Sequence, residues 1–238
     1  MIKGILFDKD GTLIEFKSVW HEIIGNIFTA LSDRFQVSEE MIDRLKMVSG
    51  YQEEDFLKES IIQYCATSEI VEIWYKVITE EDWKPEGITK EALMELFDEK
   101  ALDEAIKIEA LDGVLDVLDY LKKNHYVLGV ATADTYSSTV FSLRKADLLS
   151  YFDFIGCNDG IHHPKPQKDM AVRFCEKYHL NPQEVLIVGD SISDMQFAEN
   201  AGAHFLGLKT EYNDYEKFME RNKEVADHLS DILIRYHL

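Results

Sequence analysis

The sequence has few cysteines and few basic residues, and both shortages restrict what it encodes. Its 238 residues include only three cysteines, Cys65, Cys157 and Cys175, with no CxxC pair and no histidines at zinc-ligand spacing. This pattern predicts reduced thiols rather than a disulfide framework or a zinc site. Lysines and arginines number 25 against 45 aspartates and glutamates, so the formal charge is −20. Because such an excess of acid repels nucleic-acid phosphates and anionic lipid, we expect no nucleic acid and no membrane as a partner.

Long apolar runs are also missing. No stretch approaches the roughly 18 consecutive apolar residues that indicate a transmembrane helix. The first residues do not resemble a signal peptide, because Ile5-Leu6-Phe7 leads directly into Asp8-Lys9-Asp10. We therefore expect a cytoplasmic protein. With 46% hydrophobic and 29% charged residues, the composition is that of a globular protein with a substantial core.

The pattern of apolar residues changes twice along the chain. Residues 2–7 form a short apolar run typical of a buried strand. From residue 15 to residue 109 apolar side chains recur three and four positions apart, as in Trp20, Ile23, Ile24 and Ile27, which predicts helices. After residue 110 predicted helices alternate with predicted strands at residues 126–131, 152–155, 185–188 and 204–208.

Apolar strands that alternate with amphipathic helices predict a parallel sheet with helices on both faces. The strand at residues 2–7 has no other partner, so we expect it to join this sheet. The predicted fold class is α/β, with a Rossmann-like core made of residues 1–14 and 110–238. An inserted helical cap domain, residues 15–109, interrupts that core.

Polar side chains follow four of the predicted strands at the point where each strand ends. In chain order these clusters are Asp8 with Asp10, Thr132-Ala133-Asp134, Lys165-Pro166, and Gly189-Asp190-Ser191 with Asp194. Because ligands bind at the carboxyl ends of strands in open parallel sheets, we expect the four clusters to meet at one edge. In an extended chain Asp8 and Asp10 face the same side, and Lys9 between them is predicted to point away and to be exposed.

These side chains have a coherent chemical meaning. Three carboxylates, Asp8, Asp10 and Asp190, with Asp194 behind them, can share a small space only if a divalent cation offsets their repulsion. Magnesium suits such oxygen ligands. A carboxylate beside this ion can attack phosphorus, and a second carboxyl can protonate the leaving oxygen and later activate water. Hydroxyl, backbone N–H and ammonium groups would hold the phosphoryl oxygens.

The order and spacing of Asp8-Lys9-Asp10-Gly11-Thr12, Thr132, Lys165-Pro166 and Gly189-Asp190-Ser191-Ile192-Ser193-Asp194 resemble those of the haloacid dehalogenase superfamily. Members with a helical cap inserted after the first motif resemble the whole chain. The resemblance implies that Asp8 is the nucleophile and a magnesium ligand, and that Asp10 is the general acid and base and offers its backbone carbonyl to the metal. It makes Asp190 and Asp194 further metal ligands, although Asp194 can also be read as a helix cap. Thr132, Ala133 and Lys165 match the phosphate-binding positions.

The second aspartate distinguishes the members of this superfamily. Dehalogenases have an aromatic residue there and phosphonoacetaldehyde hydrolases have alanine, so Asp10 favours a phosphatase that resembles phosphoglycolate phosphatases. A sugar phosphomutase resembling the β-phosphoglucomutases stays open, as does a binding protein without turnover. Related mutases place an arginine in a cap loop, and the matching residues 48–52 contain neither arginine nor lysine.

The substrate implied by the resemblance is a small phosphorylated metabolite, and the protein is expected to be a monomer or a homodimer. Glu15 stands where many relatives begin an Asp-Ser pair, so the residues that face the substrate differ here. We expect Glu15, His21, Ser49 and Tyr51 to contribute to specificity. His162 and His163, before the lysine motif, are read either as a solvated loop or as a substrate contact.

Overall fold

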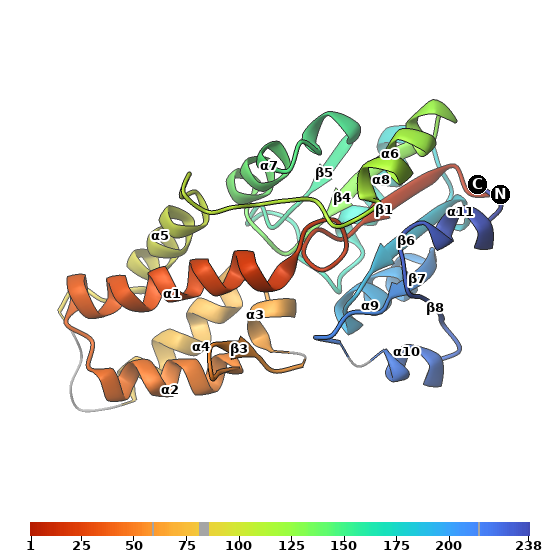
Figure 1. Ribbon diagram of the computed structural model, residues 1–238. Coiled ribbons are helices and arrows are strands. Elements are labelled where there is room, and N and C mark those ends of the chain that lie inside the picture. The colour runs from red at the N-terminus through yellow and green to blue at the C-terminus, as the bar shows by residue number, and fades with distance from the viewer. Residues whose placement is uncertain (59, 81–85, 214) are drawn as a thin grey trace. The chain divides into compact units, whose positions relative to one another are not determined.

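The computed structural model describes residues 1–58, 60–80, 86–213 and 215–238. The chain divides into two compact units (Figure 1). The first unit combines Met1–Glu15 with Ile108–Leu238, and the second is Phe16–Lys107. Each unit is described below by itself.

The first unit contains a six-stranded parallel sheet, which confirms the predicted fold class. The strand order is β5-β4-β1-β6-β7-β8, so β1, drawn in red in Figure 1, lies in the interior of the sheet. The strands are β1 Gly4–Phe7, β4 Val127–Ala131, β5 Phe154–Gly156, β6 Val185–Gly189, β7 His204–Leu208 and β8 Glu224–Ala226. The sequence analysis missed β8, because this three-residue edge strand has no apolar run to mark it.

Helices cover both faces of this sheet. They are α6 Val114–Lys123, α7 Tyr136–Lys145, α8 Asp169–Tyr178, α9 Ile192–Ala201, α10 Glu216–Glu220 and α11 Asp231–Arg235. Since successive strand residues point to opposite faces, the complete burial of every residue in β1 and β6 requires a cover on each side. On one face Phe174 of α8 and Phe197 of α9 belong to the same apolar cluster as Leu6 and Ile187 of the strands.

The strand order explains where a site can form. β1 has β4 on one side and β6 on the other. After β1 the chain adds β4 and then β5 outward in one direction, whereas after β6 it adds β7 and β8 in the other. The carboxyl ends of β1 and β6 therefore lie at a topological switch point, which is where open α/β sheets bind their ligands.

Among its described residues, the second unit forms helices and one small hairpin. Its helices are α1 Phe16–Phe35, α2 Glu39–Ser49, α3 Ile61–Tyr64, α4 Thr67–Thr79 and α5 Lys90–Ala101, packed around a fully buried Trp74. The prediction of helices alone was wrong at β2 Tyr51–Gln52 and β3 Asp55–Phe56. Gly50 ends α2 in the left-handed conformation, and Glu53 and Glu54 both have positive φ, as a two-residue type I′ hairpin turn requires.

Two expectations about the chain as a whole can be compared with the structure. None of the helices in the described ranges combines the length and apolarity that a bilayer-spanning segment needs. All three cysteines are free thiols, in agreement with their uneven spacing in the sequence.

Candidate active site

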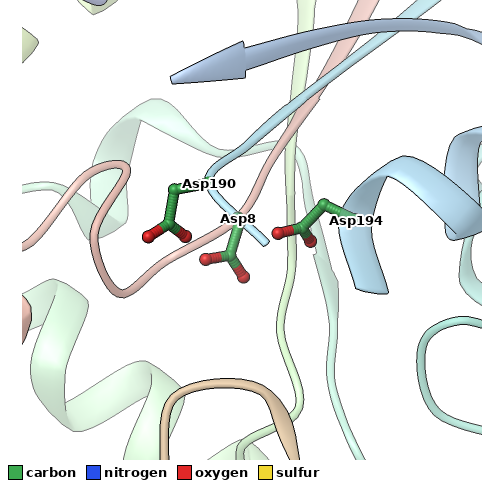
Figure 2. Close-up of side chains that lie close together, drawn as sticks. All are labelled: Asp8, Asp190 and Asp194. Atoms are coloured by element: carbon green, nitrogen blue, oxygen red, sulfur yellow. The ribbon is translucent and has the colours of Figure 1, made fainter. Parts of the chain in front are cut away.

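Three aspartates from separate segments meet at the switch point. Asp8 follows β1, Asp190 follows β6, and Asp194 lies in the first turn of α9. Each offers a carboxylate oxygen within 4.8 Å of the other two, and all three residues are buried. Figure 2 shows the three carboxylates directed toward one region. Within the described residues, this is the one group of three such side chains whose geometry suits a metal ion.

A lysine links two of these carboxylates. The Nζ atom of Lys165, in the loop between β5 and α8, lies 2.5 Å from Asp8 Oδ1 and 2.6 Å from Asp194 Oδ1. Burial raises the pKa of Asp8 to about 7; Lys165 opposes this rise, and Asp194 adds to it. Burial also opposes the charge on Lys165, but Asp194 and Asp8 outweigh it and raise the pKa of the ammonium above its ordinary value. The lysine therefore stays positively charged among the carboxylates.

Two glycines allow the aspartates to approach so closely. A Cβ atom at Gly11, where φ is +76°, would lie 2.4 Å from Asp190 Oδ2. A Cβ atom at Gly189 would lie 2.4 Å from the carboxyl carbon of Asp194. Any side chain at either position would push an aspartate out of the cluster, so the glycines of both sequence motifs serve the geometry of the site.

Gly189→Ala is expected to weaken the binding of a divalent cation to this cluster by about 10- to 100-fold, because the new methyl group displaces the Asp194 carboxylate. Isothermal titration calorimetry with Mg²⁺ measures this change. Gly25→Ala in α1 is the matched control, since a Cβ atom there meets nothing within 4 Å. An unchanged Mg²⁺ affinity in Gly189→Ala would show that the cluster tolerates a side chain at this position.

Asp194 caps a helix and also lies in the carboxylate cluster, so the reading as a helix cap is confirmed and its role as a metal ligand stays a prediction. It forms a capping box with Ser191 at the start of α9, in which its backbone N–H donates to Ser191 Oγ over 3.1 Å. In return its Oδ2 atom accepts from the Ser191 N–H over 3.0 Å. Its Oδ1 atom accepts from Lys165. The helix cap thus holds the carboxylate in one orientation while its other oxygen faces the cluster.

The predicted exposure of Lys9 was wrong. Only 1% of this residue is accessible, and its Nζ atom donates to Asp10 Oδ1 over 2.7 Å and lies 3.0 Å from Asp134 Oδ2. The chain turns after β1, with Gly11 at positive φ and the Leu13 N–H donating to the Lys9 carbonyl. Because the segment is not extended, the alternation of side chains that predicted an outward lysine does not apply to it.

The predicted phosphate-binding residues lie at the end of β4. Thr132 is buried, and its hydroxyl accepts from the Asp134 N–H over 3.3 Å. Ala133 is half-buried. β4 pairs with β1 so that Val130 is opposite Phe7, and this register brings Thr132 to the same edge as the Asp8 loop.

Asn213 is a residue near the site that the sequence analysis missed. It is buried, and its Nδ2 atom donates to the Asp190 and Leu208 carbonyls, over 2.7 Å in each case. These bonds anchor the backbone of Asp190 to the segment after β7. No motif or apolar pattern marks this position, so nothing in the sequence identified it.

The four predicted specificity residues lie in different surroundings. His21 Nδ1 and the Tyr51 hydroxyl are 2.8 Å apart inside the second unit. Ser49 is fully buried there, and its Oγ accepts from Trp74 Nε1 over 2.8 Å, so the structure gives it a packing role. Glu15, half-buried, is the last residue of the first segment of the first unit. Contact of any of them with a substrate stays a prediction.

The two loop histidines each have an acidic partner. His162 Nδ1 lies 2.8 Å from Asp159 Oδ2, and His163 Nδ1 lies 3.2 Å from Asp169 Oδ2. Arg173 also lies 3.1 Å from both His162 and Asp159. These contacts account for the positions of both histidine side chains in the loop before α8, and no bound metal is needed to explain them.

Known proteins are similar to this chain in sequence and in fold. The family model described as haloacid dehalogenase-like hydrolase matches residues 5–208. A phosphoglycolate phosphatase of Nitrosospira multiformis is 25% identical over 215 residues, covering 90% of this chain and 86% of that protein. The pyrophosphatase PpaX of Bacillus mycoides is 24% identical over 234 residues, covering 98% and 95% respectively. The crystal structure of CbbY from Rhodobacter sphaeroides in complex with phosphate has a TM-score of 0.73 at 20% identity, covering 98% of this chain and 96% of that one.

Proposed function

The chain belongs to the haloacid dehalogenase-like hydrolase family, and from this premise we propose that it hydrolyses the phosphate monoesters of small metabolites. The observation that carries the proposal is the buried cluster of Asp8, Asp190 and Asp194, with Lys165 bridging two of them, at the switch point of the sheet. The relatives include a phosphoglycolate phosphatase and a pyrophosphatase, and this supports a small phosphorylated substrate.

We assign Mg²⁺ to this cluster, with Asp10 as a further ligand through its backbone carbonyl. The residues fit the ion, because three carboxylates within 4.8 Å of one another supply the hard oxygen donors that Mg²⁺ prefers. Their burial makes the mutual repulsion of these carboxylates costly unless a cation is bound. When bound, the ion would neutralise charge that develops on the transferring phosphoryl group.

Asp8 is the proposed nucleophile. Its carboxylate oxygen forms a bond to phosphorus while the bond from phosphorus to the ester oxygen breaks, which yields an aspartyl phosphate and an alkoxide. Lys165, 2.5 Å from Asp8 Oδ1, keeps the carboxylate in one orientation and stabilises its ionised form. The same ammonium supplies positive charge beside the phosphoryl oxygens.

Asp10 is the proposed general acid and base. Its carboxyl group gives a proton to the leaving alkoxide in the first step, so that an alcohol departs. In the second step the carboxylate takes a proton from a water molecule whose oxygen attacks phosphorus. Inorganic phosphate then leaves, and the Asp8 carboxylate is restored.

Thr132 and Ala133 are proposed to bind the phosphoryl oxygens. The Thr132 oxygen accepts from the Asp134 N–H, and an oxygen that accepts this bond still carries a hydrogen to donate. The backbone N–H of Ala133 is the second proposed donor. Together with Lys165 these groups would stabilise the negative charge of the transferring group.

The test is phosphate release from a panel of small phosphoesters and an aryl phosphate, measured with Mg²⁺ and with EDTA. We expect release from at least one ester in Mg²⁺ and none in EDTA, and the ranking of the esters would identify the substrate class. A folded, Mg²⁺-loaded protein that releases phosphate from no ester would contradict the proposal. That result would favour a phosphomutase or a binding protein instead.

A further inference from the structure

Lys9 occupies an unusual place for a lysine between two aspartates of a catalytic motif. Its side chain is 2% exposed, and its Nζ atom lies 2.7 Å from Asp10 Oδ1 and 3.0 Å from Asp134 Oδ2. A buried ammonium is costly unless it is paired with carboxylates. Here burial opposes the charge, but Asp10 and Asp134 outweigh it and raise the pKa of Lys9. The lysine is therefore a fixed positive charge that joins the β1 loop to the β4 loop.

Asp134 is itself held from several directions. Its Oδ2 atom accepts from Ser138 Oγ, in α7, over 3.1 Å. Its carbonyl accepts from the Asn158 N–H over 2.8 Å, and its own N–H donates to Thr132 Oγ1 over 3.3 Å. Asp134 thus provides a rigid anchor for the end of the flexible Lys9 side chain, and the same residue orients the proposed phosphate-binding hydroxyl.

We propose that Lys9, anchored by Asp134, is a positioning residue that holds the Asp10 carboxyl group in the orientation required for proton transfer to and from the reacting oxygens. The inference rests on the proposed function, because it takes Asp10 as the general acid and base. A proton donor must lie about 2.6–3.2 Å from the oxygen that it serves. Asp10 lies beyond the end of β1, in an isolated bridge with Ile14, and the contact of Lys9 Nζ with its Oδ1 atom places one carboxylate oxygen against a buried, anchored ammonium.

Two kinds of ester distinguish the positioning of Asp10 as an acid from a general disturbance of the site. An alkyl phosphate needs a proton on its leaving oxygen, whereas the leaving phenolate of 4-nitrophenyl phosphate is stable without one. In Lys9→Met, kcat/KM for the best alkyl ester of the panel is expected to fall by about 10²-fold or more. The kcat/KM for 4-nitrophenyl phosphate should change less than about tenfold, because this constant reports only the steps through the first phosphoryl transfer.

The second step gives an independent readout. Asp10 must still take a proton from water to release phosphate from Asp8, whichever ester supplied the phosphoryl group. Lys9→Met should therefore lower kcat for 4-nitrophenyl phosphate and produce a burst of nitrophenolate in rapid mixing. Lys9→Arg, which keeps the charge, should restore part of the alkyl-ester activity, and Lys168→Met, at an exposed lysine of the same unit, should change neither ester.

Asp134→Asn tests the same inference without removing Lys9, and circular dichroism checks that each variant is folded. Asp134→Asn should lower the ratio of kcat/KM for the alkyl ester to kcat/KM for 4-nitrophenyl phosphate, as Lys9→Met does. Equal losses of kcat/KM on both esters in folded Lys9→Met or Asp134→Asn would overturn the positioning role while leaving the proposed phosphatase activity intact. A wild-type protein that hydrolyses neither ester would overturn the proposed function, and this role for Lys9 with it.

Discussion

Replacing Asp8 with asparagine is expected to lower phosphate release by at least about 10⁴-fold, because losses of this order or more follow removal of a catalytic nucleophile. Asparagine has nearly the same shape as aspartate, and its side-chain oxygen can still accept from Lys165 Nζ. The fold should therefore survive while the attacking carboxylate is lost. The measurement is phosphate release in Mg²⁺ from the best ester of the panel.

The same variant has an expected effect on stability that is independent of catalysis. In the metal-free protein burial raises the pKa of Asp8 from 3.8 to about 7, so the folded state binds a proton that the unfolded state has already released. This contribution to the free energy of unfolding is fully present below pH 3.8 and is lost as the pH rises through about 7. Asp8→Asn should therefore flatten the fall in stability over this range and be more stable than the wild type at pH 8.

A suitable control is Asp147→Asn, which makes the same chemical change at an exposed residue of the first unit. Asparagine tolerates the positive φ of this position as aspartate does. The control should keep full activity and the stability profile of the wild type. If Asp8→Asn kept more than a few per cent of the wild-type rate, another group would have to be the nucleophile.

Lys165→Met is expected to produce the largest loss of stability. The lysine contacts Asp8 and Asp194 at 2.5 and 2.6 Å, and its removal leaves buried carboxylates without their cation. Losing one partner of a buried ion pair costs about 3–5 kcal/mol of the free energy of unfolding. We expect this cost in the metal-free protein at pH 8, and a smaller one at pH 5, where Asp8 holds a proton.

Phosphate release should also fall in this variant, by about 10²-fold or more, because Lys165 is proposed to supply positive charge to the transferring phosphoryl group. The loss of stability is measured by urea unfolding, followed by far-ultraviolet circular dichroism. Tryptophan fluorescence would report on the wrong unit, because Trp20 and Trp74, the tryptophans among the described residues, lie within Phe16–Lys107. Lys168→Met, three residues further along at an exposed position, is the control. If both variants had the same free energy of unfolding at pH 8, Lys165 would not be offsetting the negative charge of the buried carboxylates.

The parallel sheet and the neighbourhood of the aspartates could be predicted because they depend on short-range patterns. An apolar run that ends in a polar cluster indicates a strand and its carboxyl end, and parallel strands bring those ends to one edge. That reasoning led to Asp8, Asp10, Asp190 and Asp194. The structure places carboxylate oxygens of Asp8, Asp190 and Asp194 within 4.8 Å of one another, whereas the Asp10 carboxylate pairs with Lys9. The same reasoning did not lead to β8, whose three residues carry no such pattern.

The partners of charged side chains could not be predicted in the same way. Lys9 was expected to be exposed, and the turn that begins after β1 instead directs it to Asp134, which follows β4. Asn213 comes from a segment with no recognisable motif, and its bonds to the Asp190 and Leu208 carbonyls depend on where the chain passes after β7.

The sequence by itself determined the α/β fold class and the aspartates that meet at the sheet edge, since periodicity and strand ends are properties of neighbouring residues. Only the tertiary structure decided that Lys165 pairs with Asp194 as well as with Asp8, and that Lys9 pairs with Asp10 and Asp134. The physical reason is that ionic contacts depend on distances of a few ångströms between segments far apart in the chain. Those distances are set by how strands, turns and helices pack together, which no local pattern of residues specifies.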